Sequence, residues 1–192
     1  MEPLSISFLD HVIKQFKYYK QLGDHTFEQL EEAHLFWQYN KASNSIAIIV
    51  KHLWGNMRSR WTNFLTTDGE KPWRNRDSEF EADFENREEL MQKWEEGWKC
   101  LFEALQEINT GNFDQLVYIR NTGHTIPEAV DRQLAHYAYH VGQIVYIGRM
   151  LKGDDWMSLS VPKGQSRAYN EKKFSQPKHK GFFTDEFLEE GN

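Results

Sequence analysis

The chain has 192 residues, a net charge of −6 and 39% hydrophobic residues, which is enough for one domain with a full hydrophobic core. Its basic residues are scattered apart from one short run late in the sequence, which argues against nucleic acid as the main ligand. The single cysteine, Cys100, excludes an internal disulfide framework and indicates a reducing compartment. There is neither a signal-peptide pattern nor an apolar stretch long enough to cross a membrane. We therefore expect a cytoplasmic protein without a membrane partner.

Two helices are predicted in the first third of the chain. Apolar residues recur at helical spacing over residues 4–22, and we expect Gly23 to end this helix. A second helix is predicted over residues 43–65, with Ser43 or Asn44 as its cap and a broad apolar face.

A long connection is predicted over residues 66–86, which are rich in glycine, proline and charge. Connections of this length inside one domain are often functional. We expect this link to dock through Trp73 and to leave its charges in water. The alternative is that residues 73–76 reach over the mouth of a pocket.

A third helix is predicted over residues 87–109, with Asn86 as its cap and Glu89 completing a capping box. Residues 113–120 favour a short strand or an extended link, and residues 121–125 a turn into the next helix.

The last predicted helix covers residues 126–151 and has the clearest signals at both ends. Thr125 can cap it, Glu128 lies at the capping-box position, and Gly153 follows its last apolar residues.

These four helices predict an all-α fold, because helices that each bury one face pack as a four-helix bundle. We expect the bundle domain to cover residues 1–153, with the long link between its second and third helices. Residues 154–192 are predicted to form a C-terminal extension that docks on the bundle or on a partner subunit.

A histidine pair marks the candidate site. His136 and His140 lie four residues apart, so both imidazoles project from one helix face. Gln133 and Gln143 extend this polar row between apolar neighbours, which is typical of a pocket. Such a pair also arises by chance and needs no metal on its own, so a third ligand is required. His52 lies in the apolar face of the second helix. A lone histidine there is usually a hydrogen-bonded core residue, but bundle packing could bring it opposite the pair.

Three neutral imidazoles suit zinc, nickel, copper or ferrous iron, and three protein ligands leave a coordination position for water or substrate. His124 lies apart from the pair, and Cys100 is expected to be a core or surface thiol rather than a nucleophile. The side chains that are candidates for orienting the rings are Asn56, Gln133, Tyr139 and Gln143.

Three segments resemble the DinB-like (DinB/YfiT) superfamily of four-helix-bundle proteins: SNSIAIIVKHLWGNMRSRW, FLTTDGEKPWRNRD and HTIPEAVDRQLAHYAYHVGQIVYIGRML. The resemblance covers residues 1–165. The last of these segments, together with WMSLSVPKGQS after it, resembles an uncharacterised branch of the superfamily. In this superfamily one histidine of helix two and an H-x-x-x-H pair of helix four hold a metal. This pattern maps onto His52, His136 and His140. The resemblance thus implies a divalent metal, with zinc or nickel as leading candidates and iron or manganese as further ones.

The resemblance also implies two classes of function. Characterised relatives are metal-dependent thiol transferases that use bacillithiol or mycothiol, and a related isomerase. This favours a hydrolase or a bacillithiol-type S-transferase acting on a small-molecule substrate, with a low-molecular-weight thiol as second cofactor of a transferase. Residues that recognise the thiol vary among relatives, so none is assigned. The alternative is a non-catalytic metal-binding or structural protein, and either form is expected to be a homodimer.

Overall fold

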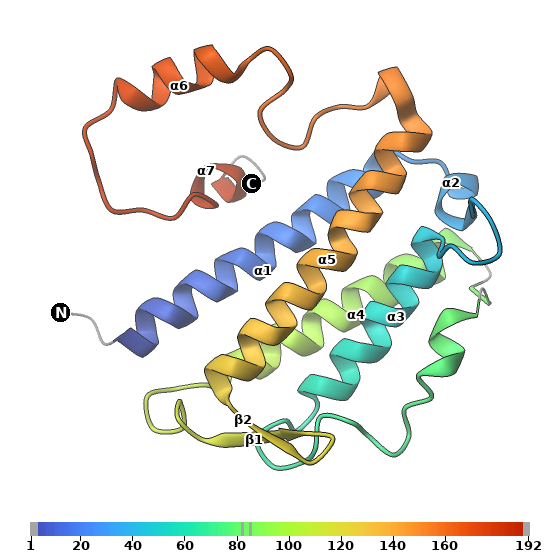
Figure 1. Ribbon diagram of the computed structural model, residues 1–192, viewed down its shortest axis with the longest axis vertical. Coiled ribbons are helices and arrows are strands. Elements are labelled where there is room, and N and C mark those ends of the chain that lie inside the picture. The colour runs from blue at the N-terminus through green and yellow to red at the C-terminus, as the bar shows by residue number, and fades with distance from the viewer. Residues whose placement is uncertain (1–3, 82, 85, 190–192) are drawn as a thin grey trace.

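A computed structural model of the chain describes residues 4–81, 83–84 and 86–189. The first three residues of the predicted domain and the last three of the predicted extension therefore lie outside the described part. The protein is mostly helical (Figure 1). Its long helices are α1 (Leu4–Glu28), α3 (Ile46–Trp61), α4 (Arg87–Gln106) and α5 (Ile126–Lys152). Helix α1 packs against α4 and α5, and α3 packs against the same two helices.

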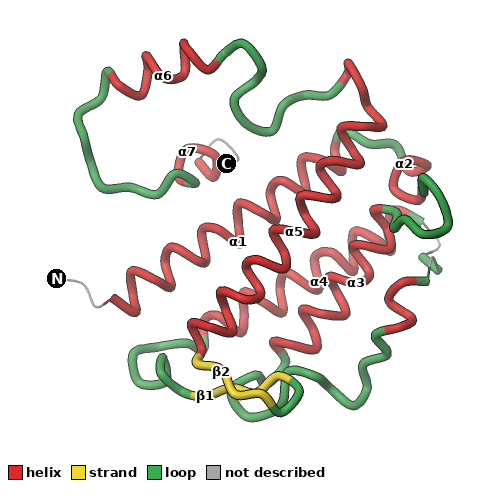
Figure 2. The backbone as a smooth tube through the Cα atoms, in the orientation of Figure 1, coloured by secondary structure: helices red, strands yellow, loops and turns green. Residues whose placement is uncertain are grey.

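Shorter elements connect and extend these helices, as the tube in Figure 2 shows. None of the helices in the described ranges combines the length and the apolar character needed to span a bilayer. The short elements are α2 (Glu32–Phe36), the 3₁₀ turns η1 (Asp77–Phe80) and η2 (Gly153–Asp155), strands β1 (Leu116–Ile119) and β2 (Thr122–Thr125), α6 (Ser166–Phe174) and α7 (Asp185–Glu189).

The long helices begin where side chains satisfy their free N–H groups. Asn86 accepts from the N–H of Glu89, and Thr125 forms the predicted capping box with Glu128. Helix α3 differs from the prediction, because its cap is Ser45 rather than Ser43 or Asn44, and the helix ends at Trp61 rather than at residue 65.

Gly23 does not end the first helix, and that prediction was wrong. Helix α1 continues to Glu28. A Cβ atom at Gly23 would lie 2.7 Å from Cη2 of Trp94, so the missing side chain makes room for an indole from α4. The ring is fixed there by its own N–H, which donates to Asp24 Oδ1 at 2.7 Å. This glycine therefore permits close helix packing.

The segment before α5 forms a β-hairpin. Strand β1 lies within the predicted extended stretch, but residues 121–125 are more than a turn, because β2 pairs antiparallel with β1. Arg120 and Asn121 join the strands with φ values of 55° and 59°, the left-handed conformation that a two-residue hairpin turn requires. Asp68 of the long link accepts hydrogen bonds from both of their N–H groups at 2.8 Å. The link and the hairpin are thereby joined.

A buried polar chain joins the two helices that carry the histidines. Trp61 Nε1–H donates to the Tyr137 hydroxyl at 3.0 Å, and this hydroxyl donates to Asn56 Oδ1 at 3.1 Å. Asn56 lies one turn after His52 on α3, and Tyr137 follows His136 on α5. These bonds therefore fix the position of α3 relative to α5 next to the site.

The C-terminal segment contacts α1 through α7. Lys14 Nζ lies 2.6 Å from Asp185 Oδ1, and Gln21 Nε2 donates to the carbonyl of Phe187 at 2.8 Å. The ring of Phe187 lies 5.4 Å from that of Tyr18. Phe174 of α6 is instead 84% exposed. The division of the chain at residue 153 stays a prediction.

Candidate metal site

Three imidazoles from two helices meet between α3 and α5. Nε2 of His136 lies 3.3 Å from Nε2 of His52 and 3.1 Å from Nε2 of His140. One ligand nitrogen from each ring lies within 4.8 Å of the others. Two ligands of one tetrahedral zinc ion, on bonds of roughly 2.0–2.1 Å, are about 3.4 Å apart. The arrangement brings together the three histidines expected from the sequence and is compatible with a metal site.

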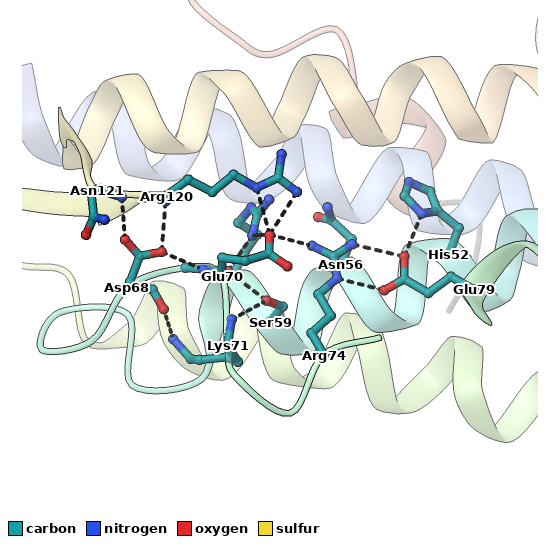
Figure 3. Close-up of polar contacts among 12 residues, drawn as sticks. His52, Asn56, Ser59, Asp68, Glu70, Lys71, Arg74, Glu79, Arg120 and Asn121 are labelled. Atoms are coloured by element: carbon teal, nitrogen blue, oxygen red, sulfur yellow. Dashed lines mark hydrogen bonds and ion pairs between the residues drawn. The ribbon is translucent and has the colours of Figure 1, made fainter. Parts of the chain in front are cut away.

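The outer nitrogen of His52 is held by Glu79, a residue of η1 in the long link. His52 Nδ1 lies 2.8 Å from Glu79 Oε2, and Arg74 donates to both oxygens of this carboxylate at 2.7 and 2.9 Å (Figure 3). Burial opposes ionisation of Glu79, but the hydrogen bonds from His52 and Arg74 keep its pKa below the ordinary value. The carboxylate therefore accepts, and Nδ1 of His52 is the nitrogen that carries the proton.

The same reasoning applies to His140. Its Nδ1 lies 3.3 Å from Oε1 of Gln143, and an amide oxygen can only accept. With a proton on Nδ1 of both rings, His52 and His140 direct Nε2 lone pairs toward His136. Burial, followed by the charges of the other two histidines, lowers the pKa of His136 to about 3. Burial and the charge of His52 lower the pKa of His140 to about 4. Neutral imidazoles with converging lone pairs are the donor set that a divalent cation needs.

The long link covers the site, but not as expected. The prediction that it docks through Trp73 was wrong, because this side chain is 56% exposed. The link is anchored by polar groups instead: Lys51 Nζ lies 2.6 Å from Asp83 Oδ1, and Ser59 Oγ–H donates to the carbonyl of Gly69 at 2.7 Å. The alternative, that part of the link borders a pocket, is the one that the structure shows.

A pocket of about 450 Å³ opens beside the histidines. Phe80 from the link stacks on His52 with ring centroids 5.0 Å apart, and Tyr139 packs edge-on against His140 at 5.0 Å. The pocket is lined by residues of α3, α5, the link and the hairpin: His52, Asn56, Arg60, Arg74, Arg76, Phe80, Arg120, Arg132, Gln133, Tyr139, His136 and His140.

The other predicted residues have different roles. Of the four candidates for orienting the rings, Gln143 hydrogen-bonds to a histidine, whereas Asn56 bonds to Tyr137. His124 lies in β2 opposite Val117, apart from the histidine cluster. Cys100 is half-buried, and burial raises the pKa of its thiol, which disfavours the nucleophilic thiolate.

Sequence reasoning missed Glu79. Its place is visible only in the structure, where Gly55, three residues after His52, leaves the space that the Glu79 carboxyl group occupies. A Cβ at Gly55 would lie 2.7 Å from Cδ of Glu79. Gly55 thus permits a close contact between α3 and the link.

Comparison with known proteins gives a family but no activity. No curated protein and no solved structure matches the chain. A family model described as "Protein of unknown function (DUF1572)" matches residues 3–165, which is most of the chain, and the protein therefore belongs to this family.

Proposed function

We propose that His52, His136 and His140 bind one divalent metal ion in a DinB-like four-helix bundle formed by α1, α3, α4 and α5. The proposed activity is that of a metal-dependent hydrolase or bacillithiol-type S-transferase acting on a small molecule. The observation that carries the proposal is the convergence of ring nitrogens from three histidines at the wall of an open pocket. Buried histidines that served only as core residues would not need their lone pairs directed at one point.

The donor set fits zinc or nickel best, because it consists of neutral imidazoles without a carboxylate ligand. When bound, such an ion supplies Lewis acidity that lowers the pKa of a water or thiol ligand. The protein's own residues prepare the site: Glu79 and Gln143 fix the ring tautomers, and Phe80 shields one face of His52. The volume of about 450 Å³ suits a small-molecule substrate.

The metal site is tested by elemental analysis of the purified protein. Wild type should carry about one equivalent of metal, whereas His52→Ala and His136→Ala should carry almost none. His124→Ala is the matched control and should retain the wild-type content. Unchanged occupancy in the His52 and His136 variants would overturn the proposal.

The transferase branch has its own test. The metal-loaded protein is incubated with bacillithiol and monochlorobimane, and the fluorescent adduct is followed. A rate above that of metal-stripped protein supports an S-transferase. A rate equal to that control rejects the transferase and leaves the hydrolase and the non-catalytic protein.

A second candidate is a non-catalytic, metal-binding homodimer. It is favoured by a row of exposed large side chains on α5, where Tyr139, Tyr146 and Met150 are 65%, 70% and 46% exposed. Exposed apolar rows of this kind often mark interfaces. Light scattering should give twice the chain mass for wild type and the single-chain mass for Tyr146→Glu. A wild-type monomer at all concentrations would reject the dimer.

A further inference from the structure

The pocket beside the histidines is rich in positive charge, although the chain has a net charge of −6. Arginines reach it from α3, the link, the hairpin and α5. Clustered guanidinium groups at one pocket indicate an anionic ligand when protein carboxylates do not neutralise them. The five that line it are Arg60, Arg74, Arg76, Arg120 and Arg132.

Three of these arginines share one carboxylate. Oε2 of Glu70 accepts from Arg74 at 3.3 Å and from Arg120 at 3.1 Å (Figure 3). The same oxygen accepts from Arg60 at 3.2 Å. Arg74 also pairs with Glu79. Burial, and next the charge of Arg74, lowers the pKa of Arg60. The three positive charges of Arg60, Arg74 and Arg120 therefore exceed the two negative charges of Glu70 and Glu79.

The other two arginines have no carboxylate partner. Across residues 4–81, 83–84 and 86–189, neither Arg76 nor Arg132 forms an ion pair, and both are exposed. Arg76 lies over the ring of Phe80 at 5.1 Å, and that ring stacks on His52. Arg132 lies one turn before His136, so it continues the face that carries the histidine pair. Both arginines line the pocket beside the three histidines, Arg76 from the link and Arg132 from α5.

Two residues that line the same pocket each have a buried side-chain atom without a hydrogen-bond partner. Arg60 is 6% exposed and Gln133 is 2% exposed. Neither Nε of Arg60 nor Oε1 of Gln133 has a hydrogen-bond partner among the described residues. Leaving such atoms unpaired is costly.

We propose that the substrate of this site carries an anionic group, a phosphate or a carboxylate, which Arg76 and Arg132 bind beside the three histidines. The inference rests on the proposed function, because it names the substrate class of that same site. Guanidinium groups bind both kinds of anion through paired N–H donors. In this arrangement the arginines hold the charged end of the substrate, and the rest of the molecule faces the histidine cluster.

Calorimetric titration tests this proposal with inorganic phosphate and succinate as probes. The full chain is titrated first in metal-stripped form, so that direct binding of the anion to metal does not contribute, and then in zinc-loaded form. Arg76→Gln and Arg132→Gln should each weaken binding about tenfold or more, because each removes charge-assisted hydrogen bonds. Arg149→Gln, which removes an exposed arginine of α5 away from the pocket, should change binding by less than about twofold. The tighter of the two probes identifies a phosphorylated or a carboxylated substrate.

Two results would overturn the proposal: no binding of either probe to wild type, or equal binding by wild type and both pocket variants. Metal content measured on the same samples separates this failure from failure of the metal site. A wild type that holds metal but binds neither anion rejects only the anionic substrate. A wild type that takes up no zinc on loading but still binds phosphate through Arg76 and Arg132 rejects only the metal proposal.

Discussion

Glu79 determines the chemical state of His52, although it lies in a loop rather than on a long helix. Its charged carboxylate fixes the proton on Nδ1 and frees Nε2. The three histidines were predicted from the sequence through spacing and family resemblance, but Glu79 was not. Acidic residues occupy alternate positions from residue 77 to residue 85, and no pattern distinguishes one from the next. Only the fold of the link selects Glu79.

Glu79→Gln should lower metal affinity about tenfold or more, because partners of ligating histidines typically contribute that much. The amide can no longer anchor Arg74 through two ionised oxygens, so some stability should also be lost. Zinc affinity is measured by competition with a chromogenic chelator. Glu81→Gln, an exposed change in the same link, should match wild type. Equal affinity in both variants would show that Glu79 has no role in tuning the site.

The lowered histidine pKa values predict acid sensitivity of the metal-free protein. Folded His136 and His140 titrate near 3 and 4, whereas the ordinary value is 6.5. Between these values the unfolded chain binds more protons than the folded one, so the free energy of unfolding falls as pH drops below about 6.5. Urea unfolding in EDTA at several pH values from about 7.5 to about 4.5 measures this slope. The double variant His136→Gln, His140→Gln should show a shallower slope, and an unchanged slope would contradict the prediction.

At the scale of elements, the decisive feature is the docking of the link on α3. Charge and glycine content predicted a long connection, and its length suggested a function. The mode of docking was not predictable, because it depends on side-chain contacts between residues about 30 positions apart, His52 with Glu79 and Lys51 with Asp83. Gly23 shows the same limit. In the sequence a glycine indicates a helix end, but in the structure its missing side chain leaves room for the ring of Trp94.

Gly55→Ala should separate the link from α3. The added Cβ would overlap the Glu79 carboxyl group, so we expect destabilisation of about 1–3 kcal/mol together with weaker metal binding. Gly142→Ala is the matched control, since its Cβ would meet nothing within 4 Å on helix α5. Alanine's higher helix propensity should stabilise that variant by about 0.5–1 kcal/mol. Urea unfolding and chelator competition measure both effects. A stabilised Gly55→Ala protein with normal metal affinity would show that the close contact is not required.

At the scale of the whole molecule, the site depends on bringing α3 and α5 together over a distance of 84 residues in the sequence. Helical periodicity predicted both helices, and the buried chain of Trp61, Tyr137 and Asn56 fixes them next to each other. The second strand of the hairpin was missed, because Gly123 and the polar residues around it carry no strand pattern. That strand forms through pairing with β1 and through the bonds from Asp68 to the turn. Long-range contacts of this kind leave little trace in local sequence.

The C-terminal segment gives a final prediction, because α7 packs against α1, whereas the three histidines lie on α3 and α5. Phe187→Ala should remove the ring contact with Tyr18 and weaken the docking of α7 on α1. If the free energy of docking falls by about 1 kcal/mol, proteases should cleave the connection after α6 about fivefold faster. Phe174→Ala changes a residue that is 84% exposed and should be cleaved at the wild-type rate. Mass spectrometry of timed digests gives both rates, and elemental analysis should show unchanged metal content in both variants. Loss of metal in Phe187→Ala would mean that this segment supports the site through α1, and equal cleavage rates would mean that Phe187 does not hold α7 in place.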